Sequence, residues 1–338
     1  GLKGNDSFLT GEKYGITYYV FSHVQKSKPF DLFKNLRSIY GILKEEKKSG
    51  GKNILITEHS YFPLFLIYVL MAKRLNYKLI VTLTEWHLYF KKIPIIKRFD
   101  FLLFDYLFGY FTDAILPIST LLEQKVRHFR KPMLKVPILA DFACMPAKRS
   151  ITEEKYFLYC GHLGYYEVIE FIIKSFILFD NTNPGVLLRL VVSGQDSLLP
   201  RVLDLIVSQN LQGKVIIERR LPFDQLVQAY TDALALLIPL RPENQDRARF
   251  SHKIGEYLAS GRPVITGAVG EIVHYFTHNK NAFIAVEYSR RAYADLMIAV
   301  AADASNARKV GMEGQRLGVK EFNYSTYGAK ISGFLNTI

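Results

Sequence analysis

The sequence predicts a two-domain α/β protein in which each domain has a doubly wound parallel sheet of Rossmann type. The chain has 338 residues, 49% of them hydrophobic, and short apolar runs alternate with longer helical patterns in both halves. Beyond roughly 250–300 residues a single hydrophobic core usually splits into domains. Strand–helix alternation is typical of parallel sheets, whose ligands bind beyond the carboxyl ends of the strands. We therefore expect two such domains in tandem, with a cleft between them.

The first half contains four runs rich in β-branched and aromatic residues that we predict to be strands. These runs lack polar alternation, which indicates strands buried on both faces of a sheet. The predicted strands are residues 16–21, 53–58, 78–83 and 113–118, and the predicted helices are 31–48, 61–75, 96–111 and 119–129. No strand with a glycine-rich turn precedes Ile16, so this half looks one unit short of a complete nucleotide-binding-type domain.

The second half repeats the scheme with five predicted strands. These are residues 155–160, 187–194, 214–219, 233–239 and 262–267, with helices near 167–179, 198–209, 223–231, 251–259 and 291–304. The prolines 132, 137 and 146 and the basic turn at Lys148 and Arg149 mark a boundary between the halves. We expect a first domain over residues 1–147 and a second over 148–325.

The positive charge of the chain is concentrated in its first half. The formal net charge is +13, and residues 1–149 contain 24 Lys and Arg against 12 Asp and Glu. Such asymmetry suggests that this half faces an anionic partner: nucleic acid, an anionic membrane or a phosphorylated substrate. General solubility is the simpler alternative. The two cysteines, Cys144 and Cys160, are too few for a disulfide framework, so a reducing compartment, the cytoplasm, is expected.

The segment 251–267 has the most specific pattern in the chain. It predicts a helix that begins after Ser251, a plausible N-cap, and ends at Gly261 before a buried strand. Lys253 and Glu256 are three residues apart and share a helical face near the helix N-terminus. A helix N-terminus favours an anion such as a diphosphate, and a carboxylate one turn later can accept two ribose hydroxyls. The alternative is an ordinary Lys–Glu pair on the surface of an amphipathic helix.

This segment resembles the donor-binding signature of glycosyltransferase family 4, the glycosyl transferases group 1, which have the GT-B fold. The matching residues are Lys253, Glu256, Tyr257, Ala259, Gly261, Pro263, Val264, Ile265, Gly270 and Glu271. Further segments resemble the family in the same order along nearly the whole chain. They are residues 112–124, with Asp113 and Ser119, 136–142, with Asp141, 156–176, 190–195 and 223–240.

The resemblance implies a GT-B glycosyltransferase of hexosyltransferase type, in which two Rossmann-like domains face a cleft. It would transfer a sugar from a nucleotide-sugar donor to a lipid-linked or polysaccharide acceptor, with retention of anomeric configuration and without a metal ion or cofactor. The first domain would then be the acceptor side and the second the donor side. Residues 326–338 would cross back to the first domain, and the protein would work in the cytoplasm, peripheral on the inner face of the membrane.

The resemblance also assigns the donor-site residues. Glu256 would bind the ribose, Lys253 and Arg249 would lie near the diphosphate, and the loop of Gly270 and Glu271 would face the sugar. The remaining donor-site candidates lie where the first two strands of the donor domain end, and they are Gly161, His162 and Gly194.

Three positions depart from the family pattern. Where the family has an arginine and a lysine that neutralise the donor phosphates, this chain has His162 and Glu167, and Ala248 replaces the first acid of the usual pair. Side chains of the neighbouring loop offer substitutes, because a point charge needs only proximity to phosphate. The basic ones are Arg241, Arg247, Arg249 and Lys253, and the acidic Glu243 could also reach the site. These departures keep a non-catalytic GT-B scaffold or partner subunit open as an alternative function.

Two residues after the strand 78–83 are candidates for catalysis. Thr84 stands where the family often has a histidine, and Glu85 and His87 follow it. Either side chain has the chemistry of a general base or an orienting group. The alternative is that this loop only packs and forms hydrogen bonds beside the cleft.

The stretch 86–104 mixes basic and aromatic residues in a way that suits an anionic membrane surface. It includes Lys91, Lys92, Lys97 and Arg98. A solvated loop followed by a core helix is the alternative.

Nucleic acid is not an expected partner, because no binding motif for it is present, although a basic binding module remains the least favoured function. No Cys/His cluster has zinc spacing and no Asp-x-Asp motif occurs, so no metal site is expected.

Overall fold

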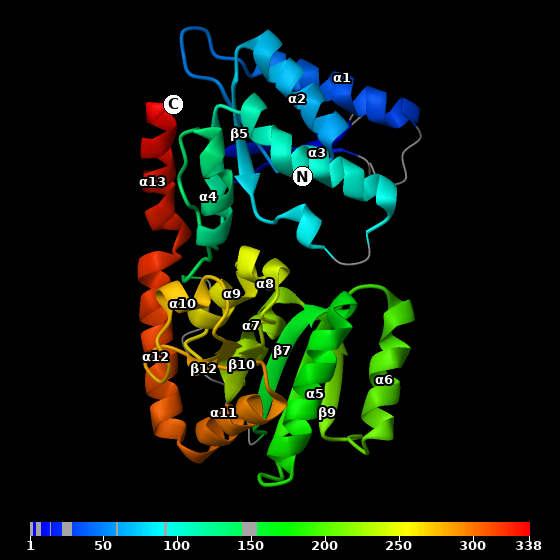
Figure 1. The fold of residues 1–338 in the computed structure, drawn as a ribbon, viewed down its shortest axis with the longest axis vertical. Coiled ribbons are helices and arrows are strands. Elements are labelled where there is room, and N and C mark those ends of the chain that lie inside the picture. The colour runs from blue at the N-terminus through cyan, green and yellow to red at the C-terminus, as the bar shows by residue number, and fades with distance from the viewer. Residues whose placement is uncertain are drawn as a thin grey trace.

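The computed structural model describes residues 3–4, 8–13, 15–21, 29–58, 60–90, 93–143 and 154–338. Two lobes lie one above the other: the first half of the chain and the C-terminal helix form one, and the rest of the second half forms the other (Figure 1). The predicted boundary between residues 147 and 148, with Pro146, Lys148 and Arg149, lies outside the described residues, as do Lys91 and Lys92.

The first domain is built on a parallel three-stranded sheet of order β4-β5-β6. Its strands are β4 (Ile54–Thr57), β5 (Lys78–Leu83) and β6 (Ala114–Pro117), which confirms three of the four strands predicted in this half. The connecting helices are α1 (Pro29–Glu45), α2 (Phe62–Leu75), α3 (Ile95–Phe111) and α4 (Thr120–Val126), with short 3₁₀ turns η2 (His87–Tyr89) and η3 (Arg127–Phe129). Helices α2, α3 and α4 contribute buried apolar side chains to the same core as the sheet, and α1 contacts α2.

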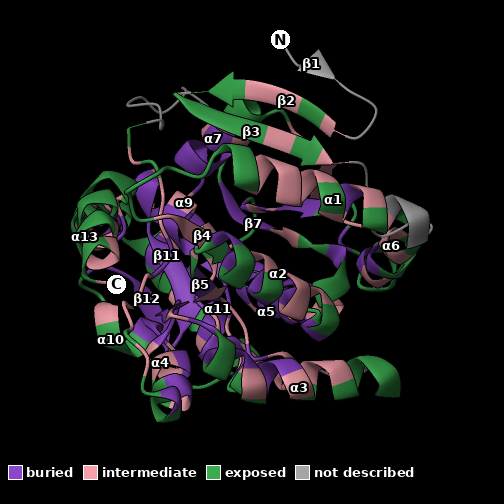
Figure 2. Cartoon of the chain, turned by 90° about the horizontal axis from the view of Figure 1, so that it is seen from above, coloured by how far each residue is buried: buried purple, intermediate pink, exposed green. Residues whose placement is uncertain are grey.

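The strand predicted at residues 16–21 does not belong to this sheet. It forms β3 (Ile16–Phe21), which pairs antiparallel with β2 (Phe8–Lys13) in a separate sheet with β1 (Lys3–Gly4). The prediction that it is buried on both faces is wrong: Ile16 is 68% exposed. Its aromatic residues instead pair across the hairpin, where the Phe8 ring lies 5.3 Å from the rings of Tyr19 and Phe21. Figure 2 shows this hairpin on the outside of the domain.

The second domain has a fully parallel six-stranded sheet of order β12-β11-β10-β7-β8-β9, with helices on both faces. Its strands are β7 (Tyr156–His162), β8 (Leu187–Ser193), β9 (Val215–Arg219), β10 (Ala235–Ile238), β11 (Val264–Gly267) and β12 (Phe283–Ala285). The helices are α5 (Tyr166–Asp180), α6 (Leu199–Ser208), α7 (Phe223–Asp232), α8 (Asn244–Ala248), α9 (His252–Ala259), α10 (Ile272–Tyr275) and α11 (Arg290–Ala302), with turns η4 (Leu163–Tyr165) and η5 (Asp196–Leu198). The predicted α/β class with doubly wound parallel sheets is confirmed.

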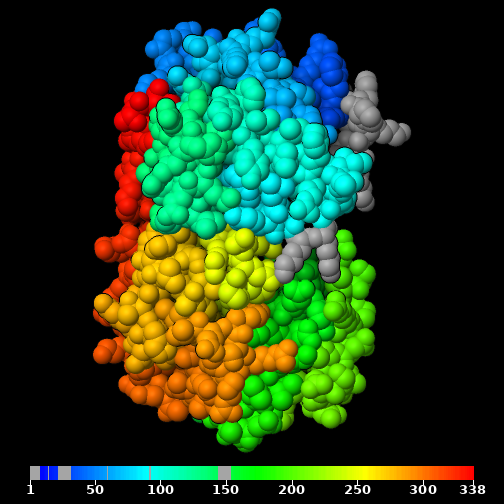
Figure 3. All heavy atoms as spheres, viewed as in Figure 1, coloured from blue at the N-terminus to red at the C-terminus, as the bar shows by residue number. Residues whose placement is uncertain are grey.

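The chain passes between the domains a second time near its C-terminus. Helix α12 (Ala304–Glu321) lies on the second domain, and α13 (Tyr324–Thr337) runs along the first, as the red segment of Figure 3 shows. Apolar side chains at the end of α13, including Phe334 and Leu335, pack on strands β5 and β6. The two segments that pass between the domains are joined by a hydrogen bond, in which the Ala140 amide donates to the Phe322 carbonyl at 2.9 Å.

One hydrophobic core continues through the contact between the domains. It includes Trp86 and Ile138 from the first domain and Tyr156 and Phe250 from the second. Phe322, which is fully buried, lies in its middle with its ring centroid 5.4 Å from that of Phe250. The carboxyl ends of β7 and β10 consequently face the first domain across a packed contact, which positions the site described next.

Candidate active site between the domains

A cavity of about 440 Å³ lies between the two domains, at the carboxyl ends of their strands. Glu58, Thr84 and Glu85 line it from the loops after β4 and β5. The second domain contributes the residues after β10 and the start of α9. These are 238–241, Asp246 and 249–253, joined by Tyr165 and Val168. This is the place where open parallel sheets bind their ligands.

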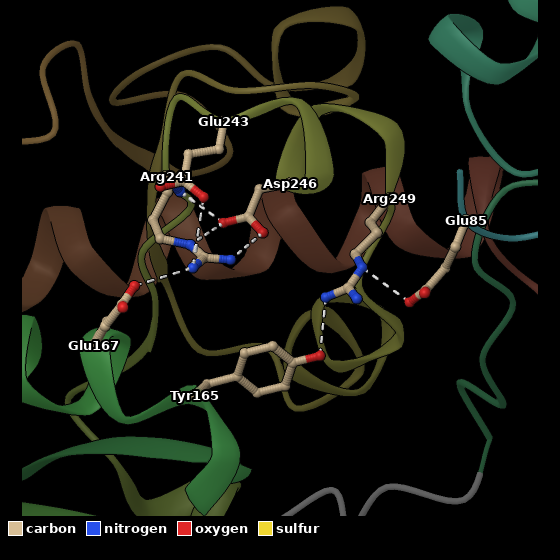
Figure 4. A network of polar contacts seen from close by, with 7 residues as sticks. All are labelled: Glu85, Tyr165, Glu167, Arg241, Glu243, Asp246 and Arg249. Atoms are coloured by element: carbon tan, nitrogen blue, oxygen red, sulfur yellow. Dashed lines mark hydrogen bonds and ion pairs between the residues drawn. The ribbon is translucent and has the colours of Figure 1, made fainter. Parts of the chain in front are cut away.

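Arg249 connects the domains across this cavity. Its Nε atom lies 2.9 Å from Glu85 Oε1 of the first domain, and its Nη1 donates to the Tyr165 hydroxyl at 2.9 Å (Figure 4). The two charged side chains are only 20% and 31% exposed. Arg249, one of the residues expected near the diphosphate, therefore lines the cavity. Its positive charge is already paired with the Glu85 carboxylate.

Arg241 is buried and surrounded by three carboxylates, as Figure 4 shows. It donates from Nε and Nη2 to Asp246 at 2.9 Å each, and its Nη1 lies 3.5 Å from Glu167 and 3.7 Å from Glu243. The hydrogen bond to Asp246 raises the pKa of Arg241, although burial opposes this. Arg241 consequently pairs with Glu167, the residue at the position of the family's lysine. Its charge is compensated by the three carboxylates and is not available to a phosphate.

Glu256 and Lys253 lie on α9, where the sequence predicts them. Lys253 Nζ donates to Glu256 Oε2 at 3.2 Å, and the Tyr230 hydroxyl donates to the same oxygen at 3.1 Å. Glu256 Oε1 has no hydrogen-bond partner among the described residues, and 37% of this side chain is exposed. Lys253 lines the cavity, and Glu256 lies one turn further along the helix. Glu256 thus keeps one oxygen available to an added hydroxyl donor.

The surroundings of Lys253 and Tyr230 fix their protonation states. Burial opposes the charge of Lys253, but neighbouring groups, among them the hydrogen-bonded Glu256 carboxylate, outweigh it and raise the pKa of Lys253. Burial also raises the pKa of Tyr230, so its hydroxyl stays protonated and donates to Glu256. Ser251 occupies the N-cap position but forms no side-chain capping bond. The start of α9 therefore offers uncapped N–H groups and a cation to the cavity.

Gly161, His162 and Gly194 meet where β7 and β8 end. His162 pairs in register with Ser193, and its Nδ1 accepts from the Gly164 amide at 2.9 Å. Gly194 has φ +113°, and a Cβ there would lie 2.7 Å from His162 Nε2. A side chain at position 194 would therefore clash with the imidazole, so this position requires glycine. None of the three lines the 440 Å³ cavity.

Glu271 crosses to the first domain instead of facing the cavity. It is 2% exposed, accepts the Thr120 amide at 2.6 Å and pairs with Lys135 at 3.0 Å. Burial opposes the charge of Lys135, yet Glu271 raises the pKa of this lysine above its ordinary value. Gly270 has φ +58°, and a Cβ added there would lie 3.0 Å from the Arg247 carbonyl oxygen. In this structure the Gly270–Glu271 loop joins the domains.

Glu85 and His87, the two candidates for catalysis, have different surroundings. Glu85 lines the cavity, whereas His87 does not. The His87 ring stacks on Phe101 at 5.0 Å, and its Nδ1 lies 2.7 Å from Asp105 Oδ1. Asp105 is fully buried and also accepts the Leu88 amide at 3.0 Å. This geometry holds the loop after β5 in place.

Sequence reasoning missed several residues of the site. Tyr165, Asp246, Tyr230 and Lys135 supply partners to Arg249, Arg241, Glu256 and Glu271. Asp246 had a usable signal, because it lies five residues after an arginine at the end of a predicted buried strand. The others are brought in by elements far away in the sequence. Within the described ranges, no group of three or more His, Cys, Asp or Glu side chains is arranged to hold a metal ion.

Comparison with known structures shows the same two-domain arrangement. Sucrose-phosphate synthase from Thermosynechococcus elongatus superimposes with a TM-score of 0.76 at 15% identity, over 98% of this chain and 86% of that one. For HepE from Anabaena, in complex with UDP-glucose, the TM-score is 0.73 at 12% identity, over 92% of this chain and 84% of that one. For a glycosyltransferase from Rickettsia africae, the TM-score is 0.71 at 15% identity, over 94% of this chain and 84% of that one. These solved structures share the GT-B fold.

The family comparison covers the candidate donor domain. A sequence search of curated proteins found no match. The family model "Glycosyl transferases group 1" matches residues 144–316, which is just over half of the chain and includes the Lys253 and Glu256 signature. The chain belongs to the glycosyl transferases group 1 family.

Proposed function

We propose that the protein transfers a hexosyl group from a nucleotide-sugar donor to a lipid-linked or glycan acceptor. The observation that carries this proposal is the cluster of Lys253, Glu256 and Tyr230, in which Lys253 lines the interdomain cavity and Glu256, one turn further along α9, keeps Oε1 open to a ribose hydroxyl. The Anabaena structure, which holds UDP-glucose in the same fold, supports a donor of this class.

In the proposed donor complex the diphosphate lies at the start of α9. Lys253 and the uncapped N–H groups after Ser251 stabilise the negative charge that develops on the departing diphosphate, together with Arg249. These groups take the role that a metal ion has in other transferases, and the reaction retains anomeric configuration. His162, Gly161 and Gly194 approach the donor from the ends of β7 and β8. The sugar then extends toward Glu85, which lines the cavity.

Glu85 is the better placed of the two candidate catalytic residues, because it lines the cavity. Its pairing with Arg249 ties it to the proposed diphosphate site, so donor binding and the position of Glu85 are linked. His87, held by Asp105, acts as a positioning residue for the same loop. The division into an acceptor domain over 1–147, a donor domain over 148–325 and a C-terminal segment over 326–338 remains a prediction.

Thermal stabilisation by a panel of UDP-, GDP- and ADP-sugars tests the proposed function. A ligand that binds only the native state at a hundredfold excess over its Kd adds about 2.7 kcal/mol of stability. We expect one nucleotide class to raise the melting temperature clearly and the other two to leave it unchanged. The absence of a shift with every donor would contradict the proposal and favour a scaffold without donor binding.

We also propose that helix α3 holds the protein against an anionic membrane. Its residues 95, 99, 102, 106 and 110 are spaced by three or four and form one exposed apolar face. Ile95 and Phe99 are 84% and 64% exposed, whereas Phe104 and Phe108 on the opposite face are buried. Figure 2 shows the exposed part of α3 on the outside of the first domain. None of the described helices is long and apolar enough to cross a membrane.

Vesicle sedimentation tests this surface. We expect the protein to bind vesicles that contain phosphatidylglycerol and to bind pure phosphatidylcholine vesicles much less, because the first half of the chain is strongly basic. The double variant Ile95→Ser and Phe99→Ser removes two of the most exposed apolar side chains and is expected to lower binding about tenfold or more. Leu70→Ser, at a 66% exposed position on α2, is the control. Equal binding of all three proteins would contradict the assignment to α3.

A further inference from the structure

A second cavity, of about 500 Å³, lies beside the proposed donor cavity. From the first domain it is lined by Phe90, which follows η2, and by Lys97 and Phe101 of α3. From the second domain it is lined by residues 164–167 at the start of α5, by Arg201 of α6 and by the α8 region. Tyr165, Arg241 and Arg249 line both cavities, which are therefore neighbours.

The two cavities differ in charge. The donor cavity is lined by three carboxylates, Glu58, Glu85 and Asp246, and by three Lys and Arg residues. Among the described residues, the second cavity is lined by four Lys and Arg residues and one carboxylate, Glu167. Arg241 and Arg249 are paired as described above, but Lys97 and Arg201 form no ion pair with any described residue. Two uncompensated cations therefore face this cavity.

The second cavity also presents aromatic faces. The Arg201 guanidinium lies 3.6 Å from the centroid of the Tyr166 ring, which holds this side chain in a fixed orientation. Its N–H groups stay available at the edge of the ring. On the other wall the rings of Phe90 and Phe101 pack edge to face at 6.0 Å. Aromatic rings beside hydrogen-bond donors suit the C–H face and the polar edge of a sugar.

We infer that this second cavity binds a saccharide acceptor that carries a carboxylate or phosphate group, with Arg201 and Lys97 on the anion. The inference rests on the proposed function, because it names the class of acceptor for that same cleft. The position fits an acceptor, since this cavity shares Tyr165, Arg241 and Arg249 with the proposed donor cavity. An anionic sugar is either a uronic acid unit of a glycan or the glycosyl phosphate of a carrier.

Titration of three small probes tests the inference: methyl β-D-glucopyranoside, methyl β-D-glucuronide and α-D-glucose 1-phosphate. Each is added to the protein alone and to the protein saturated with UDP, and binding is followed by calorimetry or ligand-observed NMR. At least one anionic probe is expected to bind about tenfold more tightly than the neutral glycoside, a difference of about 1.4 kcal/mol, because its anion accepts charge-assisted hydrogen bonds. Binding of the glucuronide alone indicates a glycan acceptor, and binding of the phosphate alone indicates a carrier.

Variants separate this cavity from the donor site. Arg201→Gln and Lys97→Gln are each expected to abolish most of the preference for the anionic probe and to leave the affinity for UDP unchanged. The exposed Arg308 and Lys44 supply matched controls, Arg308→Gln and Lys44→Gln, which are expected to change neither. Tyr166→Leu is expected to weaken the anionic probe as well, because it removes the ring under Arg201.

Several results would overturn the inference. They are no binding of any probe, no preference for the anionic probes, an equal loss in the control variants, or a parallel loss of UDP affinity in Arg201→Gln. The last result would make the cavity part of the diphosphate site. A failure of UDP to bind the wild-type protein would instead contradict the proposed donor function, while the titrations without UDP would still report on this cavity.

Discussion

Replacing Arg241 by methionine is expected to lower the free energy of unfolding by about 3–5 kcal/mol. The side chain is 10% exposed and compensates Asp246, which is 9% exposed, through two hydrogen bonds of 2.9 Å. Without the guanidinium, Asp246 becomes a buried unpaired charge, and Glu167 and Glu243 lose the cation between them. Denaturant titration of the second domain measures the change, with the midpoint shifted and the slope preserved.

Two control variants make this prediction specific. The double variant Arg241→Met and Asp246→Leu is expected to recover much of the loss, because removing both partners of a buried pair leaves no uncompensated charge. Arg308→Met, at an exposed position, is expected to change stability by less than about 0.5 kcal/mol. If Arg241→Met were no more costly than Arg308→Met, the network in Figure 4 would not stabilise the fold as described.

Replacing Glu256 by alanine is expected to weaken binding of the nucleotide donor by about 10–100-fold. The loss corresponds to roughly 1.5–3 kcal/mol for hydrogen bonds between a charged acceptor and neutral hydroxyls. The free Oε1 atom is the group that would accept them, while Oε2 is already bonded to Lys253 and Tyr230. Calorimetric titration with the donor identified by thermal stabilisation measures the change in Kd.

The chain offers a closely matched control for this substitution. Glu313 and Arg316 form another ion pair three residues apart on a helix, and Glu313 is 34% exposed against 37% for Glu256. Glu313→Ala removes the same kind of surface pair and is expected to leave the donor Kd unchanged. An equal effect of both substitutions, or none for Glu256→Ala, would show that Glu256 takes no part in donor binding.

The fold could be predicted largely from the pattern of apolar runs. The strand–helix alternation of the second half corresponds to β7 through β11 and the helices between them, because each buried parallel strand is a continuous apolar run. The same reasoning failed at residues 16–21, since aromatic and β-branched residues also suit an exposed hairpin whose rings pair across strands. Strand β12 has only three residues, too few to stand out.

The candidate site was predictable only in part, because the sequence reports residue types and not their pairing. Lys253 and Glu256 could be placed on one helical face from their spacing alone. Nothing in the spacing revealed that Glu271 pairs with Lys135, 136 residues away, or that Arg249 reaches Glu85. Both pairs depend on how the two domains pack. The same holds for Arg241, which looked like a substitute phosphate ligand but is occupied by Asp246.

The structure of the complex with UDP tests the central claim most directly, because that claim places the nucleotide of the donor at the start of α9. The account predicts the ribose hydroxyls within about 2.7–3.2 Å of Glu256 Oε1, and the diphosphate against Lys253 and the first N–H groups of α9. A nucleotide bound elsewhere, or a Glu256 carboxylate turned away from the ribose while the nucleotide occupies the cleft, would contradict the account.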